Sequence, residues 1–518
     1  MDWRSEILDG VSEIRYNGCV PGGIVVFGEK AEAILTNKKG EILIAAAEYG
    51  NGRAVVFAHD CFVKHFVNER SENSILLSNI KRWLLKGNSN CSVIDLRDNN
   101  SDIMNQNSTL LQTPTIFTCS DLENSSVESV EILGRYVFSG AGLLCGVTPW
   151  GYMQVTGKEI ADIPILGVLR QMGLTFTSGY YSTSDRLVVT ENCAQYMKID
   201  NLAREIMDGS FKEYFHGAAL MLAHLPDEVY EEFRPALVAI MDSCDPESYA
   251  PCKGGSITTD LGKLRCKIVC HLLRRDAFAG KLTIAPFIDS FPGNFIEEPE
   301  TIDTTLTFSS SRHRVFPTGC YLPAGIKMSV RIIEGVVDSS WALLIGSHSD
   351  ELYNISDTEL RRWPKIQLKK PIDVNSFEIA SPFGGLIYIQ SSPADLEKTL
   401  TLEICNIVPS PLFTYDKIDQ WESSERYKQG LWCDLVGDRI MITLPSSSVR
   451  NLEDLSLPLQ VWDSVVSAHI ELRGCDPSNG RGQWVVTDEQ PSCGYMHAGY
   501  PIVTHMDVAD SSKVCWLV

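Results

Sequence analysis

The hydrophobic pattern of the chain changes character twice, and these changes constrain the fold more than any other feature. Up to about residue 180, short apolar runs alternate with stretches in which apolar residues recur at helical spacing. Apolar runs bounded by glycine or turn residues predict buried strands, and a period near 3.6 residues predicts helices. The predicted strands are 23–28, 33–36, 42–47, 54–58, 93–96 and 143–146, and the predicted helices are 74–85 and 127–138. Such alternation indicates a layered α/β domain.

The pattern changes after about residue 183 and again near residue 298. Segments with helical periodicity come first, with no convincing strand between them: 195–207, 213–225, 228–241 and 261–273. Short β-type runs separated by turn residues follow: 304–308, 327–333, 342–345, 377–379, 385–389 and 399–404. Short strands at such spacing are typical of a β-sandwich. After residue 409 the pattern predicts a helix at 457–472, a strand at 483–487 and an edge strand at 499–503.

These changes divide the chain into four predicted parts. Residues 1–182 form an α/β domain, 183–297 a helical linker segment, 298–408 a β-sandwich and 409–518 a mixed α+β domain. The length of 518 residues fits this division, because a domain usually holds about 100–200 residues. The predicted fold class is therefore α/β multidomain.

Composition limits the class of partner. Asp and Glu number 66 and Lys and Arg 45, so the net charge is −21. This balance argues against a general nucleic-acid binder and against electrostatic docking on anionic lipid, since both need clustered basic side chains. The N-terminal residues show no secretory signal, and no window reaches the roughly 18 apolar residues of a membrane helix. We therefore expect a cytoplasmic protein whose 16 cysteines are mostly free thiols.

No complete catalytic or metal-binding motif is present in the sequence. None of the ten histidines begins a His-Glu-x-x-His sequence, which would place two imidazoles on one zinc ion. His497 and His505 are eight residues apart, and without a third ligand this spacing favours surface or hydrogen-bonded histidines. Cys145 ends a predicted strand, where class I amidotransferases hold a nucleophile, but their Gly-x-Cys-x-Gly pattern is not matched. We expect a buried thiol there instead.

The last four residues formally fit a prenylation box that begins at Cys515. Valine is not a typical final residue of such a box, and no polybasic run precedes it. Whether Cys515 carries a lipid stays open at this point.

Five sequence blocks together resemble a known family. They are Ile42–Arg53, Gly140–Leu144, Thr318–Gly325 followed by Ile345–Leu352, Trp462–Val466 and Cys493–Ile502. The last block contains the string HAGYPI and resembles the enhancin-like (M-60) metallopeptidases, and especially the TRP-channel-associated factors. The first two blocks resemble that family's amidotransferase-like N-terminal repeat, and the third resembles the β-sandwich ahead of its peptidase domain. All five blocks occur in the family's order.

This resemblance implies a function and a fold. It implies a flavodoxin-like, amidotransferase-like domain over 1–182 and the start of a peptidase-like domain over 409–518. It also implies a non-catalytic protein that binds a TRP-melastatin-type channel from the cytoplasmic side, at the inner face of the plasma membrane, and affects its delivery to the surface or its gating.

The departures from the family pattern are as informative. Family peptidases carry a zinc-binding His-Glu-x-x-His shortly after HAGYPI, but only 16 residues follow Ile502 and none matches it. The factors usually carry two amidotransferase-like repeats, and one is recognised here. We therefore expect a chain truncated before the zinc motif, with no catalytic residue, metal ligand or cofactor.

The residues that match the family's edge strand are the predicted binding site. They are His497, Gly499, Tyr500 and Pro501. In the family this strand lies beside the active-site cleft, where an extended segment can pair with it. The alternative interpretation is that the strand only holds its domain together. Apolar surface is expected beside the strands at 483–503, because the covering helices of the family are missing.

A different class of function stays open as the alternative. The chain could be a fragment or isoform of a zinc metallopeptidase that acts on mucin-type glycoproteins, with a carbohydrate-binding β-sandwich. Glycan binding needs surface aromatic residues, and Trp341, Trp363 and Tyr353 are available, although a position in the sandwich core suits Trp341 better.

Overall fold

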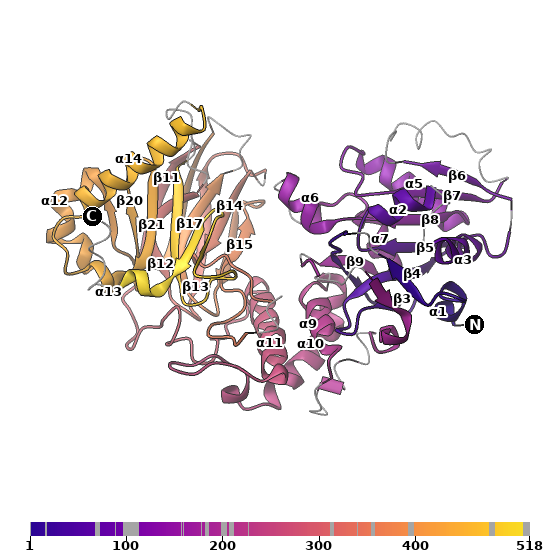
Figure 1. The fold of residues 1–518 in the computed structure, drawn as a ribbon. Coiled ribbons are helices and arrows are strands. Elements are labelled where there is room, and N and C mark those ends of the chain that lie inside the picture. Colours follow the sequence, from indigo (N-terminus) through magenta and orange to yellow (C-terminus); the bar gives the residue numbers. More distant parts are fainter. Residues whose placement is uncertain are drawn as a thin grey trace. The chain divides into compact units, whose positions relative to one another are not determined.

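A computed structural model describes the chain from residue 2 to residue 510 (Figure 1). The residues within this range that it does not describe are 16–17, 68–72, 89, 97–112, 157, 159, 178, 182–185, 198–201, 203–204, 207–211, 226, 311–314, 339, 354–357, 392–397 and 476–481. The chain divides into two compact units, Met1–Ser243 and Cys244–Val518. The division into four domains predicted from the sequence stays a prediction.

A mixed sheet forms the centre of the first unit. In its described part the strand order is β6-β7-β8-β5-β4-β2-β9, and β3 also pairs with β4. The strands are β2 (Gly23–Val26), β3 (Ala31–Thr36), β4 (Ile42–Tyr49), β5 (Gly52–Phe57), β6 (Ser92–Asp95), β7 (Thr115–Cys119), β8 (Gly142–Gly146) and β9 (Leu174–Thr177). Strands β6, β7, β8 and β5 run parallel, whereas β4, β2, β3 and β9 pair antiparallel. Strands β7 and β8 are buried at every residue, as is usual for parallel strands in the middle of a covered sheet.

The first unit also contains helices, most of which contact the strands of this sheet. They are α1 (Trp3–Ile7), α2 (Cys61–Val67), α3 (Ser74–Leu84), α5 (Val127–Ser139), α6 (Pro149–Thr156), α7 (Leu166–Leu169), α9 (Phe215–Ala223) and α10 (Asp227–Asp242). The Ser126 hydroxyl accepts the Ser129 N–H at the start of α5, and Gly140, at φ 132°, ends that helix. A small separate sheet pairs β1 (Glu13–Arg15) with β10 (Arg186–Val188), and the sequence predicted neither strand.

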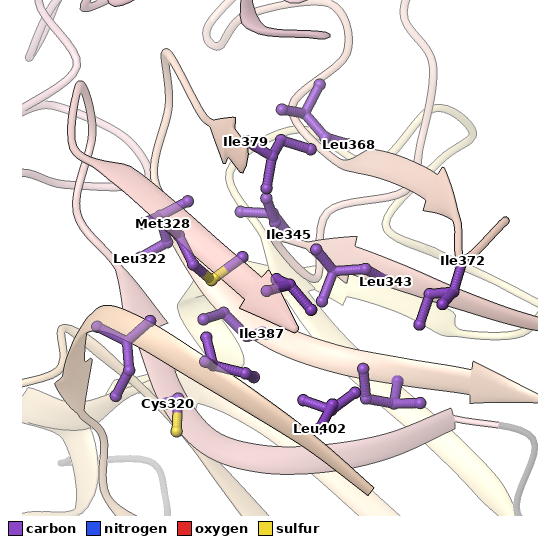
Figure 2. Close-up of a cluster of buried hydrophobic side chains, with 14 of the residues drawn as sticks. Cys320, Leu322, Met328, Leu343, Ile345, Leu368, Ile372, Ile379, Ile387 and Leu402 are labelled. Atoms are coloured by element: carbon purple, nitrogen blue, oxygen red, sulfur yellow. The ribbon is translucent and has the colours of Figure 1, made fainter. Parts of the chain in front are cut away.

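The second unit begins with α11 (Asp260–Phe278) and continues into antiparallel β-structure. The strands are β11 (Ile302–Ser309), β12 (Val315–Leu322), β13 (Lys327–Glu334), β14 (Trp341–Ile345), β15 (Leu368–Pro371), β16 (Ser376–Ala380), β17 (Gly385–Ser391) and β18 (Thr399–Pro409). Strand β18 pairs with β11 and β13 along most of its length and with β12 at Val408 and Pro409, so it joins two groups of strands. Leu322, Met328, Ile345, Ile387 and Leu402 come from both groups and meet in one core (Figure 2).

A mixed sheet in the described part of residues 409–510 completes the second unit. Its order is β19-β20-β21-β22-β24-β23. The elements are β19 (Leu412–Thr414), α12 (Ile418–Ser423), β20 (Trp432–Val436), β21 (Ile440–Pro445), α13 (Ser446–Val449), α14 (Ser456–Leu472), β22 (Gln483–Asp488), β23 (Met496–His497) and β24 (Ile502–His505). Strand β23 therefore lies at one edge. The 3-10 helices in the described parts of both units are Ile160–Asp162, Arg170–Met172, Val189–Glu191, Ala194–Tyr196, Pro246–Ser248, Tyr415–Lys417, Glu425–Tyr427 and Met506–Ala509.

The aromatic residues that the sequence suggested for glycan binding are buried. Trp341 and Trp363 are each 1% exposed and Tyr353 is 6% exposed. The Trp363 ring packs between Tyr249 and Phe383, and its Nε1 donates to the Pro286 carbonyl at 3.3 Å. The expectation that Trp363 and Tyr353 are available at the surface is therefore wrong, because tertiary packing covers them, while the core position preferred for Trp341 is confirmed.

Across the described residues, no helix is both long and apolar enough to cross a membrane.

Candidate functional site

The predicted binding residues lie at one edge of the six-stranded sheet, in the part of it that the structure describes. His497 belongs to β23, and Gly499, Tyr500 and Pro501 form the turn that leads into β24. The sequence predicted a strand over 499–503, whereas β24 begins at Ile502. Pro501 has no N–H for a ladder, and a Cβ at Gly499 would lie 2.7 Å from the Pro501 carbonyl oxygen, so this stretch is a tight turn. The Tyr500 ring packs against Trp484, with centroids 6.0 Å apart.

His497 connects two of the family-like sequence blocks. Its Nε2 lies 2.7 Å from Asp350 Oδ2, and its Nδ1 lies 3.0 Å from the Ala498 carbonyl oxygen. Burial lowers the pKa of His497, but the hydrogen bonds to Asp350 and Ala498 outweigh it and raise the pKa above its ordinary value. Both neighbouring atoms are acceptors, so this geometry suits an imidazolium that donates from both nitrogens. A histidine held in this way has no lone pair for a metal ion.

The segment that carries Asp350 is itself anchored in the interior. His348 is 2% exposed and lies between the rings of Phe291 and Trp432, with centroids 4.7 and 4.5 Å away. Burial lowers the pKa of His348 to about 4, so this ring is neutral at pH 7. Asp350 also accepts the backbone N–H of Ser492 at 2.8 Å. The block around Asp350 thereby fixes the connection between β22 and β23.

An apolar groove of about 550 Å³ lies beside this edge strand. It runs between α14 and the face of β21, β22, β24 and β23. The residues that line it are Ile440, Ile442, Leu444, Trp462, Val465, Val466, His469, Ile470, Arg473, Gln483, Val485, Thr487, Tyr495, Met496, Ile502, Thr504, Val508 and Ala509. Met496 is 62% exposed and Tyr495 is 53% exposed. An exposed apolar patch of this kind is typical of an interaction surface.

The side chains that line the groove suit the binding of a partner better than the binding of a catalytic zinc ion. Among the described residues that line it, His469 is the one imidazole and none is Cys, Asp or Glu. The zinc ion of a peptidase needs at least three such ligands, so this donor set does not fit one. The groove can instead hold an apolar segment, and β23 can offer main-chain hydrogen bonds to an extended one.

Cys145 lies in the interior of β8 and is completely buried. The hydrogen bond with the Cys119 thiol, and then burial, raise its pKa well above the ordinary value. A thiol with a raised pKa and no exposure is a poor nucleophile.

One cluster of possible metal ligands was missed by the sequence analysis. Cys19, His59 and Cys61 place their ligand atoms within 4.8 Å of one another in the first unit. Burial raises the pKa of the Cys61 thiol, and its hydrogen bond with Cys19 raises it further. The sequence signal was a His-x-Cys pair, but the third residue lies forty positions earlier, and only the fold brings it close.

Three family models match the sequence. A model described as "TRPM8, N-terminal domain" matches residues 2–190, the N-terminal domain of M60-like peptidases matches 297–404, and "Peptidase M60, enhancin and enhancin-like" matches 406–516.

Curated relatives match along nearly the whole chain. TRPM8 channel-associated factor 1 of Homo sapiens is 25% identical over 541 residues, which cover 98% of this chain and 57% of the relative. Factor 3 of Mus musculus is 25% identical, covering 98% and 56%, and the Danio rerio homolog is 23% identical, covering 96% and 56%. The chain therefore spans about half the length of the curated relatives it matches. These matches confirm the resemblance predicted from the five sequence blocks.

Solved structures show the same fold. The structure of IMPa from Pseudomonas aeruginosa in complex with an O-glycopeptide has a TM-score of 0.51 at 13% identity, covering 97% of this chain and 68% of that one. A second structure of this metallopeptidase has a TM-score of 0.50 at 13% identity and the same coverage. The mixed α/β fold class is thus confirmed at this level.

Proposed function

We propose that this relative of the TRPM8 channel-associated factors is a non-catalytic regulatory protein that binds a TRP-melastatin-type channel and promotes its delivery to the cell surface or modulates its gating. The observation that carries the proposal is the similarity to these factors over 96–98% of the chain. The match of residues 2–190 to the channel-named N-terminal domain supports it further. The protein would act in the cytoplasm, at the inner face of the plasma membrane.

The finer domain assignments belong to the same proposal. We assign 1–182 to a flavodoxin-like, amidotransferase-like domain without a nucleophile, supported by its four parallel strands and the buried Cys145. Residues 183–297 would be a helical linker, 298–408 the β-sandwich and 409–518 a partial peptidase-like domain.

Within this function, the groove beside β23 would bind an extended apolar segment of the channel. Its lining is mostly apolar, and Met496 on the edge strand and Val465 on α14 present side chains that are 62% and 37% exposed. An added strand would pair with β23, and its side chains would enter the groove. His497, Gly499, Tyr500 and Pro501 would then act by holding β23 in place.

Co-precipitation and surface biotinylation test the proposal. The full chain is co-expressed with the TRPM8 channel, as wild type and as the variants Met496→Asp and Val465→Asp. We expect the wild type to co-precipitate with the channel and raise its surface amount, and each variant to lose roughly tenfold in binding, because a charge must be desolvated in an apolar groove. Ile333→Asp, at a 49% exposed position on β13 away from the groove, is the matched control. Absence of wild-type binding would reject the function, and equal binding by all variants would reject the groove.

The fold similarity to IMPa supports a second candidate. That metallopeptidase was solved with an O-glycopeptide, so a glycopeptide could occupy the groove and the chain could be part of a mucin-type glycoprotein peptidase. The sequence contains no His-Glu-x-x-His, and this favours binding of a glycopeptide over its cleavage. Incubation with a mucin-type O-glycopeptide, followed by mass spectrometry, decides the point, because cleavage would favour the peptidase.

A further inference from the structure

Three segments of the first unit meet at the end of strand β5. The chain leaves β5 at Phe57 and turns through His59 and Asp60 into α2. The segment ahead of β2 runs beside this turn, because the Gly22 N–H donates to the Ala58 carbonyl at 2.8 Å. The connection after β8 reaches the same place, since Thr148 Oγ1 donates to Asp60 Oδ1 at 3.2 Å. Strands β5 and β8 are parallel, so this is the carboxyl end of the sheet, where α/β folds usually bind ligands.

This convergence brings two thiols and an imidazole together. The ligand atoms of Cys19, His59 and Cys61 all lie within 4.8 Å of one another, and all three residues are partly buried. A tetrahedral zinc ion with bonds of about 2.0–2.3 Å holds its ligand atoms roughly 3.3–3.8 Å apart. Small rotations of these side chains are therefore enough to surround one cation. Thiolate and imidazole ligands together select zinc over magnesium or calcium, which prefer oxygen.

The surroundings hold the three residues in position. Trp150 Nε1 donates to the Val20 carbonyl at 2.9 Å and fixes the chain next to Cys19. Asp60 Oδ1 lies 3.0 Å from His59 Nδ1, and its other oxygen lies 2.6 Å from Lys64 Nζ. A carboxylate that contacts a ligand histidine orients the ring and makes it a better donor. The backbone N–H of Cys61 lies 3.1 Å from the same nitrogen of His59 and competes with Asp60 for it, so the contact with Asp60 becomes a hydrogen bond when Nδ1 carries the proton and Nε2 faces the metal ion.

We propose that Cys19, His59 and Cys61 form a zinc-binding site that ties the segment ahead of β2 to the β5–α2 connection. Both thiols lose their protons to solvent when Zn²⁺ binds, and the two sulfurs and one imidazole nitrogen supply three bonds. A water molecule completes the tetrahedron at the fourth position. This site is independent of the groove in the second unit and goes beyond the proposed function.

Metal analysis of the purified full chain tests the site. Protein freed of metal with a chelator is mixed with ZnCl₂, passed over a desalting column and measured by elemental mass spectrometry. We expect about one zinc ion per chain for the wild type, and loss of that zinc for Cys19→Ser, Cys61→Ser and His59→Gln. Cys252→Ser, at an exposed thiol of the second unit, is the control and should retain the ion. Equal zinc content in wild type and all three site variants would overturn the proposal.

A second measurement, made on the wild type, tests the site even if the variants do not fold. Zinc should raise the unfolding temperature of the metal-free wild type, because an ion that binds the native state stabilises it. Cobalt substitution should give a thiolate-to-metal charge-transfer band that Cys61→Ser lacks. The site would be overturned if fully reduced wild type showed neither a zinc-induced rise in unfolding temperature nor the cobalt charge-transfer band. It would also be overturned if Cys19 and Cys61 formed a disulfide and the reduced thiols then bound no zinc.

Discussion

Arg362 Nε donates to Asp488 Oδ1 at 2.6 Å, and both side chains are completely buried. The same guanidinium donates from Nη1 to the Trp363 carbonyl and from Nη2 to the Asp350 carbonyl, at 2.8 and 3.4 Å. Arg362 lies ahead of β15 of the antiparallel sheet, and Asp488 ends β22 of the six-stranded sheet. One buried ion pair therefore joins the two β-layers of the second unit, and through Asp350 it supports His497 at the sheet edge.

Removal of one partner of this pair should be strongly destabilising. Asp488→Ala leaves a buried guanidinium without its counter-charge, so we expect a loss of about 3–5 kcal/mol in unfolding free energy. The double variant Arg362→Met/Asp488→Leu should lose less than Asp488→Ala alone, since no buried charge is left unpaired. Urea unfolding of the full chain measures both. A single variant as stable as wild type would contradict the role assigned to the pair.

The His497–Asp350 contact should give a pH-dependent contribution to stability. The pKa of His497 is raised in the folded protein, so the contribution is full below the unfolded pKa near 6.5 and is lost as pH rises through the higher folded pKa. We expect about 0.2–1 kcal/mol for this partly exposed pair. His497→Gln and Asp350→Asn should each remove this decline, which urea unfolding between pH 5 and 8 can follow. The double variant should lose no more of this pH-dependent stability than either single variant. If the losses of the two single variants added up in the double variant, the two residues would not act as a pair.

The ionisation of Asp434 should lower the free energy of unfolding as the pH rises. It is 1% exposed, and it accepts from Tyr388 OH at 3.0 Å and from Thr443 Oγ1 at 2.5 Å. Burial outweighs these two bonds and raises the pKa of Asp434 to about 7 from 3.8. The native state then holds a proton that the unfolded state has lost, so stability falls between pH 4 and pH 7.

Asp434→Asn isolates this effect. The stability of the variant relative to wild type should improve by about 2–3 kcal/mol between pH 5 and pH 8, because one pKa unit is worth about 1.4 kcal/mol. Chemical unfolding at the two pH values measures the difference. A relative stability that does not change with pH would mean that Asp434 is ionised in the native state.

Cys145 should be protected from alkylation in the native protein. Its burial and raised pKa keep the thiol protonated and out of reach, whereas Cys252, Cys475 and Cys493 are exposed. With iodoacetamide we expect Cys145 to react at least about 100-fold more slowly than these three, because it must wait for the unit to open. Peptide mass spectrometry over time measures each rate. Reaction of native Cys145 as fast as Cys252 would contradict its burial and reopen the question of a nucleophile.

Local pattern predicted much of the secondary structure. The runs at 42–47, 54–58 and 143–146 are β4, β5 and β8, and the helices predicted at 74–85 and 127–138 are α3 and α5. In these segments burial is nearly continuous or strictly periodic, so the sequence carries the signal by itself. The pattern missed other strands: β1, β7, β9, β10, β12, β15, β19, β20, β21 and β23. In β12, Pro317 and Gly319 read as turn residues, and the register with β17 shifts between Pro317 and Tyr321 to accommodate them.

The sequence alone determined the α/β, helical and β-rich character of the segments and the family resemblance, because these depend on residues close together in the chain. Only the tertiary structure decided which side chains are covered and which distant residues meet. It buried Trp363, brought Asp350 to His497 across 147 positions and Cys19 to Cys61, and placed β23 at the edge of the described sheet. The physical reason is that burial, hydrogen-bond partners and pKa shifts come from contacts between strands and loops far apart in sequence, and no local period records them.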